Sequence, residues 1–516
     1  MQIATFCDAV VVKFRSSGLF VAFFALALCS AGAAIVERAS PPPRPNVLFV
    51  ISDDLSARIA PAGYEGVKTP VLDRLAAEAT TFRRAYCQYP VCGPSRASFL
   101  SGLYPQSTGV LDNQVGIEET RPGTPTLPRV FRDAGYWTAA VGKVFHKHGV
   151  NPGGTTWDVA EAFSNDEMEI ERVAREKFER EHGPVETTAN RRRWRDHLLT
   201  IAPQTRNQGV KGLGPGYGPT GLRDEQHNDG KNARRVASWL TTRAHGGKPF
   251  LIAVGLHKPH IPFLAPDAYF DLYPKASLRL VTPPKNDWSD IPAIAATKQY
   301  LDYGFPELGR EDDARRREFT QAYYACISFI DAQLGVILDA LRTSGQWENT
   351  IIVFVGDHGY NLGEHFMWGK VMLFEESARV PLIVRVPGIT RGVQARGLVE
   401  MLDIFPTLAE LCAIKPPAHL QGRSIVPMLR DASAPGKERA YTVVRRGETL
   451  GTAIRFDRWR YTEWGKPELN ELYDLDGDPR EWTNLAKDPA HADTVRRASQ
   501  LLAQATREAQ SQAAQR

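Results

Sequence analysis

NVLFVISDD, residues 46–54, is the stretch of sequence that decides the fold. Its residues from Val47 to Ile51 are all apolar, and the run ends at Ser52, Asp53 and Asp54. A continuous apolar run predicts a strand that is covered on both faces, and therefore a parallel or mixed sheet between helices. Open α/β sheets bind their ligands at the carboxyl ends of the strands, so the two aspartates stand where a site is expected.

Four further apolar runs follow the same pattern along the chain. They span residues 138–141, 250–254, 351–355 and 382–386. Helical periods lie between them: one begins at Thr69-Pro70 and reaches about Ala79, and a long amphipathic one covers Glu318 to Leu341. The alternation of strands and helices predicts an α/β fold with a mixed, mostly parallel sheet between helices.

Polar residues follow four of these five runs. They are Asp53-Asp54, Lys143, His257 and Asp357-His358. One polar strand end is unremarkable, but four that converge at one edge of a sheet predict a site.

The composition fits a globular protein. The 516 residues are 43% apolar and 24% charged, which excludes collagen-like, coiled-coil and wholly disordered chains. The net charge of +4 and the lack of a long basic stripe do not favour a nucleic-acid partner. Six cysteines are too few to stabilise a chain of this length as a disulfide scaffold.

Residues 1–34 read as a secretory signal peptide. Lys13 and Arg15 form a basic region, Leu19 to Leu28 is an apolar run, and Ala31 to Ala33 are small. The run is too short to span a bilayer, and the bulky Leu28 before Cys29 argues against a lipoprotein, although a membrane anchor or a buried helix is the alternative. We therefore expect export to the periplasm or the medium, with a mature chain that does not span a membrane. Residues 35–45 form a Pro-rich tether.

The rest of the chain divides into two parts. Residues 46–430 are expected to form the catalytic domain, in which the densely charged range of about 160–245 is interpreted as a surface insertion or as a solvated helix without a role. Residues 431–516 are expected to form a smaller C-terminal α+β subdomain. It would carry a short antiparallel sheet, from strands at 441–444, 451–456 and 459–464, and end in a helix.

The stretch CGPSRASFLSG, residues 92–102, is the most informative for chemistry. A cysteine before Gly-Pro and a small polar residue indicates a nucleophile at a turn that enters a helix, whose N-terminus favours an anion. The local sequence leaves open a structural cysteine or a disulfide with Cys87.

Cys-x-Pro-Ser-Arg followed by Leu-Ser-Gly resembles the maturation and catalytic motif of type I sulfatases, members of the alkaline phosphatase superfamily. The resemblance implies that Cys92 is oxidised to Cα-formylglycine by the formylglycine-generating enzyme, with Pro94 and Arg96 in the recognition sequence. It also implies an alkaline phosphatase-like fold and a formylglycine hydrate as the nucleophile in hydrolysis of sulfate esters.

Other stretches extend the resemblance over about residues 46–430, and more weakly to 471–475. GYWTAAVGKVFH (135–146) resembles the second sulfatase signature, which implies that Lys143 binds the sulfate and that His146 acts as a base. Its Lys-to-His spacing is typical of the iduronate-2-sulfatase branch, which GLHKPHIPF (255–263), GDHG (356–359) and WGK (368–370) also resemble. In that branch His257, helped by Lys370, would protonate the leaving alcohol.

The metal site is expected between two strand ends. Asp53, Asp54 and Asp357 would repel one another unless a cation lies among them, and oxygen ligands suit Ca²⁺ or Mg²⁺. The resemblance favours Ca²⁺, also touched by the modified Cys92, with His358 where most sulfatases carry Asn. The predicted metal ligands are Asp53, Asp54, Cys92, Asp357 and His358. The predicted catalytic residues are Cys92, Arg96, Lys143, His146, His257 and Lys370. The residues interpreted as structural are Cys87, Cys326, Cys412 and Lys258. His260 and His365 are interpreted as structural or as residues that support the ones in contact with the substrate.

The resemblance implies an exported sulfatase that acts on a sulfated carbohydrate. The branch suggests 2-O-sulfated uronic acid, as in glycosaminoglycan degradation, and a cation for its carboxylate from Arg445, Arg446 or the insertion. Three alternatives stay open: a sulfatase for another sulfated polysaccharide or an aryl sulfate, a phosphate or phosphonate monoester hydrolase of the same superfamily, and a polysaccharide-binding protein without activity. A thiol enzyme is a poorer fit because no Cys–His–Asn pattern is present.

Overall fold

The computed structural model describes residues 44–146, 156–201, 216–295 and 313–512. The predicted signal peptide and nearly all of the predicted tether lie outside the described residues. Among the described helices, Asp313–Thr343 is long and apolar enough to cross a membrane, but 78% of its apolar window is buried inside the protein.

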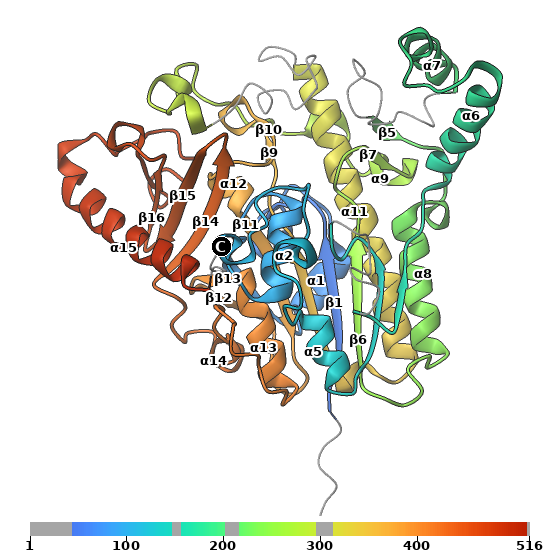
Figure 1. The fold of residues 1–516 in the computed structure, drawn as a ribbon, viewed down its shortest axis with the longest axis horizontal. Coiled ribbons are helices and arrows are strands. Elements are labelled where there is room, and N and C mark those ends of the chain that lie inside the picture. Colours follow the sequence, from blue (N-terminus) through green and yellow to red (C-terminus); the bar gives the residue numbers. More distant parts are fainter. Residues whose placement is uncertain (1–43, 147–155, 202–215, 296–312, 513–516) are drawn as a thin grey trace, which may run out of the picture. The chain divides into compact units, whose positions relative to one another are not determined.

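A nine-stranded sheet forms the centre of the fold (Figure 1). Its parallel part contains β8 (Thr350–Gly356), β1 (Asn46–Ser52), β6 (Phe250–Leu256), β3 (Trp137–Gly142) and β4 (Val159–Glu161), in that order. Beyond β8 the sheet turns mixed: β11 (Arg379–Arg385) runs antiparallel to both β8 and β2 (Thr80–Tyr86). Two short strands, β12 (Val393–Ala395) and β13 (Val399–Glu400), extend it along β2. The predicted mixed, mostly parallel sheet is confirmed.

The apolar side chains of β1 are buried in two separate hydrophobic cores, one on each face of the sheet. Leu48 and Val50 belong to the cluster packed by α1 (Pro70–Ala76), α8 (Asn228–Thr241) and α11 (Asp313–Thr343). Val47, Phe49 and Ile51 point to the other face, which is covered by α2 (Cys92–Ser101), α5 (Leu127–Asp133) and α13 (Ile404–Leu411). Successive side chains of a strand point to opposite faces, so a strand covered on both sides must be apolar throughout. The first helix is shorter than expected because the chain already enters β2 at Thr80.

The charged range 160–245 divides into two kinds of structure, and only its first part fits the interpretation as a surface insertion. α6 (Asp166–His182) and α7 (Thr188–Ile201) have a small core of their own, from Phe178, Val185 and Trp194. By contrast, α8 buries Val236 and Leu240 in the main core. The many charged residues of the range as a whole concealed the apolar face of this one helix. That face is buried because it covers the sheet.

The C-terminal part is a four-stranded antiparallel sheet, as expected, with one strand more than the three predicted. Its strands are β14 (Arg439–Arg446), β15 (Thr449–Phe456), β16 (Trp459–Glu463) and β17 (Glu471–Asp474), and the terminal helix α15 (Ala492–Gln510) packs on them. Further short elements are β7 (Phe263–Ala265), β9 (Asn361–Leu362), β10 (Trp368–Gly369) and α12 (Glu375–Ala378).

Candidate active site

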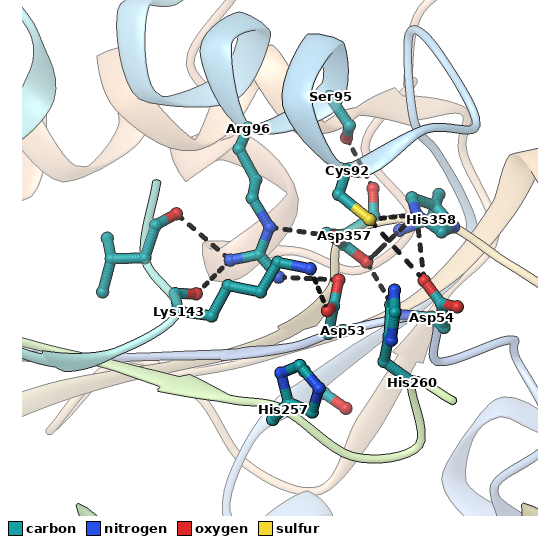
Figure 2. A network of polar contacts seen from close by, with 12 residues as sticks. Asp53, Asp54, Cys92, Ser95, Arg96, Lys143, His257, His260, Asp357 and His358 are labelled. Atoms are coloured by element: carbon teal, nitrogen blue, oxygen red, sulfur yellow. Dashed lines mark hydrogen bonds and ion pairs between the residues drawn. The ribbon is translucent and has the colours of Figure 1, made fainter. Parts of the chain in front are cut away.

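The four polar strand ends meet at one edge of the sheet (Figure 2). Ser52 of β1 is in register with Gly356 of β8 and with Leu256 of β6, so the residues that follow these strands start from neighbouring positions. Asp54 takes a left-handed backbone conformation, with φ of 61°. Such a conformation is unfavourable for a non-glycine residue and recurs at functional sites.

Four of the five predicted metal ligands form a compact group. Asp53, Asp54, Cys92 and His358 each offer one ligand atom, and these atoms all lie within 4.8 Å of one another. Asp54 Oδ2 is buried and has no hydrogen-bond partner among the described residues. A buried carboxylate oxygen without a donor is unfavourable unless a cation meets it, so the group fits a divalent ion.

Asp357, the fifth predicted ligand, is engaged differently. Its Oδ1 accepts the backbone N–H groups of Asp54 and His358, at 2.9 Å each, and its Oδ2 lies 2.9 Å from Arg96 Nε. Asp357 therefore holds the backbone of Asp54 and His358 in place, and its Oδ1 is 3.7 Å from His358 Nε2, so its role as a ligand stays a prediction.

Three cations surround the acidic group. Arg96 is fully buried and bonds to Asp53, to Asp357 and to the carbonyl oxygens of Lys143 and Val144. Lys143 pairs with Asp53. Burial acts to raise the pKa of Asp53, but Lys143, followed by His260 and Arg96, holds it well below its usual range. At Asp54 burial outweighs the attraction of Lys370 and raises the pKa to about 6.

Cys92 is the first residue of α2, where the helix N-terminus favours negative charge. Gly93 donates its N–H to Asn113 Oδ1 at 2.8 Å, and a Cβ at Gly93 would lie 2.7 Å from that oxygen, so a larger residue would displace the Asn113 side chain. The Cys92 sulfur lies 3.3 Å from His358 Nε2. Burial and Asp53 disfavour its ionisation, but Lys143 and Lys370 outweigh them and lower the pKa of the thiol.

Three buried or half-buried histidines, His146, His257 and His260, lie near the acidic group. His257, predicted as catalytic, and His260 are neighbours at this edge of the sheet, with ring centres 5.1 Å apart, and both rings interact with Asp53. Burial, followed by the charges of Lys370 and Lys143, holds the pKa of His260 well below its usual range. Burial also lowers the pKa of His257 to about 3 and that of His146 to about 4. Both rings interact with Asp53, so the catalytic role of His257 stays a prediction.

One residue of this site was missed entirely from the sequence. Asp229 of α8 is fully buried, and its two carboxylate oxygens accept the backbone N–H groups of His257 at 2.7 Å and of Lys258 at 2.8 Å. Lys258 is buried too, and donates to Pro262 O at 2.5 Å, which fits the structural role expected of it. Asp229 does not belong to any motif recognised in the sequence. Its importance is visible only from its contact with a segment 28 residues away, which the folded structure shows.

The other cysteines of the described residues are free and buried: Cys87, Cys326 and Cys412. A disulfide between Cys87 and Cys92, left open by the local sequence, is therefore not formed in this structure. His365 lies outside the acidic group, with its ring stacked on Phe374 and its Nδ1 3.0 Å from Asp287 Oδ2.

Comparison with known proteins shows which family this chain resembles. The family model described as Sulfatase matches residues 45–414, and that described as N-sulphoglucosamine sulphohydrolase, C-terminal, matches residues 363–508. A sulfatase from Formosa agariphila is 33% identical over 457 residues, covering 86% of this chain and 83% of that protein. The iduronate 2-sulfatase of Mus musculus is 30% identical over 488 residues, covering 87% and 79%.

Two solved structures share the fold. A 2-O GAG sulfatase aligns with a TM-score of 0.69 at 23% identity, covering 90% of this chain and 92% of that one. A phosphonate monoester hydrolase from Silicibacter pomeroyi aligns with a TM-score of 0.71 at 23% identity, covering 90% and 96%. The fold is thus common to hydrolases of sulfate esters and of phosphonate esters.

Proposed function

The chain belongs to the sulfatase family, and from that premise we propose that it removes the 2-O-sulfate of a uronic acid in a sulfated carbohydrate. The observation that carries the hydrolytic part is the placement of Cys92: at the N-terminus of α2, against the acidic group and beside Lys370. The 2-O position rests on relatives, one of which is an iduronate 2-sulfatase.

Asp53, Asp54, Cys92 and His358 would hold a divalent cation, which we propose to be Ca²⁺, with Mg²⁺ as the alternative. When bound, the ion would polarise the sulfate oxygens, and formylglycine at position 92 would supply a nucleophilic hydroxyl group. Asp357 and Arg96 keep the ligands in place through the hydrogen bonds described above. Maturation of Cys92 makes the formylglycine-generating enzyme a proposed partner.

The chain's own residues would bind and protonate the substrate. Lys143 and Lys370 place two positive charges beside the position of the nucleophile, which favours a sulfate there. His260 Nδ1 lies 2.6 Å from Ile261 O, so Nδ1 keeps a proton and Nε2 exchanges one. We propose that His260, rather than His257, serves the leaving oxygen, and that His146, whose Nδ1 is buried without a partner in the described residues, serves as the base at position 92.

Export is also part of the proposal, supported by the signal-like residues 1–34. A phosphate or phosphonate monoester hydrolase remains the alternative, since the fold is shared with such an enzyme.

A panel of substrates tests the proposal with matured protein of known metal content. It compares a disaccharide ending in 2-O-sulfated uronic acid, the 6-O-sulfated glucosamine counterpart, an aryl sulfate, an aryl phosphate and an aryl phosphonate. We expect kcat/KM to be highest for the 2-O-sulfated uronate and metal analysis to find one equivalent of Ca²⁺. A preference for the phosphate or phosphonate would contradict the sulfatase proposal, and a preference for the glucosamine sulfate would contradict the substrate.

A further inference from the structure

β14 of the C-terminal sheet runs beside the segment that enters the nucleophile helix. Thr442 Oγ1 donates to Cys87 O at 2.7 Å, and Val443 N donates to Gln88 O at 2.9 Å. Arg445 N donates to the Tyr89 hydroxyl oxygen at 2.8 Å. These three bonds hold the end of β14 against residues 87–89, which lie a few positions before Cys92 in the sequence.

Two consecutive arginines, Arg445 and Arg446, end this strand, and they are engaged in different ways. Arg446 donates to Val371 O, directly after Lys370, and lies 3.4 Å from Ala295 O. Its guanidinium also lies over the Trp464 ring, 5.8 Å from the ring centre. Arg446 therefore anchors the segment that follows Lys370.

Arg445, by contrast, is exposed, and its partner belongs to the loop that bonds to the start of the nucleophile helix. Its side chain is 43% exposed and pairs at 2.7 Å with Asp112, whose side chain is 40% exposed. Asp112 is followed by Asn113, the residue that accepts the N–H of Gly93 next to Cys92. An exposed ion pair contributes only about 0–1 kcal/mol, so exchange of the Asp112 carboxylate for another carboxylate costs little.

The cations inside the site are already engaged with its carboxylates. Arg96 bonds to Asp53 and Asp357, and Lys370 bonds to Asp54 at 2.6 Å. These charges surround the position of the sulfate, and a sugar with a second anionic group needs a cation farther out. The planar guanidinium of Arg445 can bind a carboxylate through two parallel hydrogen bonds.

We infer that Arg445 determines specificity by binding the carboxylate of the uronic acid, in exchange for Asp112. The inference rests on the proposed function, because it presupposes a substrate that carries a carboxylate beside its sulfate. Arg446 is left with a positioning role.

The test compares two substrates on matured protein: the 2-O-sulfated uronate disaccharide and its carboxyl-reduced counterpart, in which CH₂OH replaces the carboxylate. Arg445→Gln is expected to raise KM for the uronate about 10- to 100-fold, the range of a hydrogen bond between charged groups, while kcat and the kinetics on the reduced substrate stay within about twofold. Arg458→Gln is the matched control, because Arg458 is a similarly exposed arginine in the turn after β15, where it pairs with Asp474 of β17. Its KM for both substrates should equal that of the wild type.

Each outcome separates the inference from the proposed function. An unchanged KM of Arg445→Gln for the uronate, or an equal loss on both substrates, overturns the inference while the wild-type activity stands. A wild type that cleaves the aryl sulfate but neither disaccharide contradicts the proposed substrate and, with it, the inference.

Discussion

The ammonium nitrogen of Lys370 lies 3.1 Å from the sulfur of Cys92. The same nitrogen is 2.6 Å from Asp54 Oδ1, so one cation bridges the position of the nucleophile and a predicted metal ligand. A fixed positive charge at this point stabilises negative charge that develops on the reacting oxygens, because Lys370, Cys92 and Asp54 are all buried.

Lys370→Met is expected to lower kcat for an aryl sulfate about 10²- to 10³-fold, since removal of one preorganised electrostatic contact has effects of that size. Lys437→Met provides the control, because Lys437 also pairs with two carboxylates, Glu400 and Asp403, outside the site. This control should lose thermal stability and keep its kcat. A Lys370→Met variant with the kcat of the wild type would show that the contact has no part in turnover.

His260 and His257 can be separated by the leaving group. If His260 protonates the leaving oxygen, His260→Ala loses about 10²- to 10⁴-fold in kcat/KM on a sugar sulfate. The loss should be far smaller on 4-nitrophenyl sulfate, whose leaving group needs no proton. His257→Ala should show no such dependence on the leaving group; the reverse pattern would return the role to His257.

Asp229 should act on catalysis through the His257–Pro262 segment. Asp229→Asn places an amide N–H₂ against one of the two backbone donors, so the segment shifts and kcat falls about 10- to 100-fold. Asp331 of α11 offers a matched control, because it also accepts two backbone N–H groups. Its donors are Val71 and Leu72 at the start of α1, outside the His257–Pro262 segment. Asp331→Asn should lower the melting temperature alone. If both variants lose the same amount in melting temperature and keep the kcat of the wild type, Asp229 has only a structural role.

Glu375 should make stability depend on pH. Burial opposes its ionisation, but Arg460 of β16, followed by Arg379 and Arg455, lowers its pKa to about 2. A carboxyl with a depressed pKa stabilises the fold above its unfolded pKa, near 4.5, and the contribution is lost as the pH falls towards 2. Its ionisation thus contributes about 3 kcal/mol at neutral pH.

The measurement is the free energy of unfolding of the wild type and of Glu375→Gln from pH 7 to pH 3. We expect the wild type to be the more stable at pH 7 and the difference to shrink steadily below pH 4.5. A difference that does not change with pH would show that the carboxylate charge is not what joins α12 to β16.

The sequence allowed most of the sheet to be predicted, for a physical reason. The continuous runs of β1, β3, β6 and β8 exist because helices cover both faces, and a run of that kind is visible without a structure. β2 was not predicted, since Arg83 and Arg84 interrupt its apolar pattern. The antiparallel direction of β11 was also out of reach, because an apolar run carries no information about the direction of its neighbours.

The site was predictable where residues follow a strand and lie in a motif. Asp53, Asp54, Cys92 and His358 were named from the sequence, and their ligand atoms gather within 4.8 Å. Asp229 was not, because its role depends on which way a buried segment turns after β6. Arg445 could not be separated from Arg446, since neighbours on a strand point to opposite faces and only the fold shows which face is engaged.

The central claim is that residue 92 acts as formylglycine in hydrolysis of sulfate esters. Its most direct test is the turnover rate of an aryl sulfate, measured against the fraction of residue 92 that mass spectrometry finds as the aldehyde, in which oxygen has replaced the sulfur and two hydrogens. We predict that turnover rises in proportion to this fraction and is absent from a preparation that holds only the thiol. Full turnover by the thiol form, or by Cys92→Ala, would contradict the account.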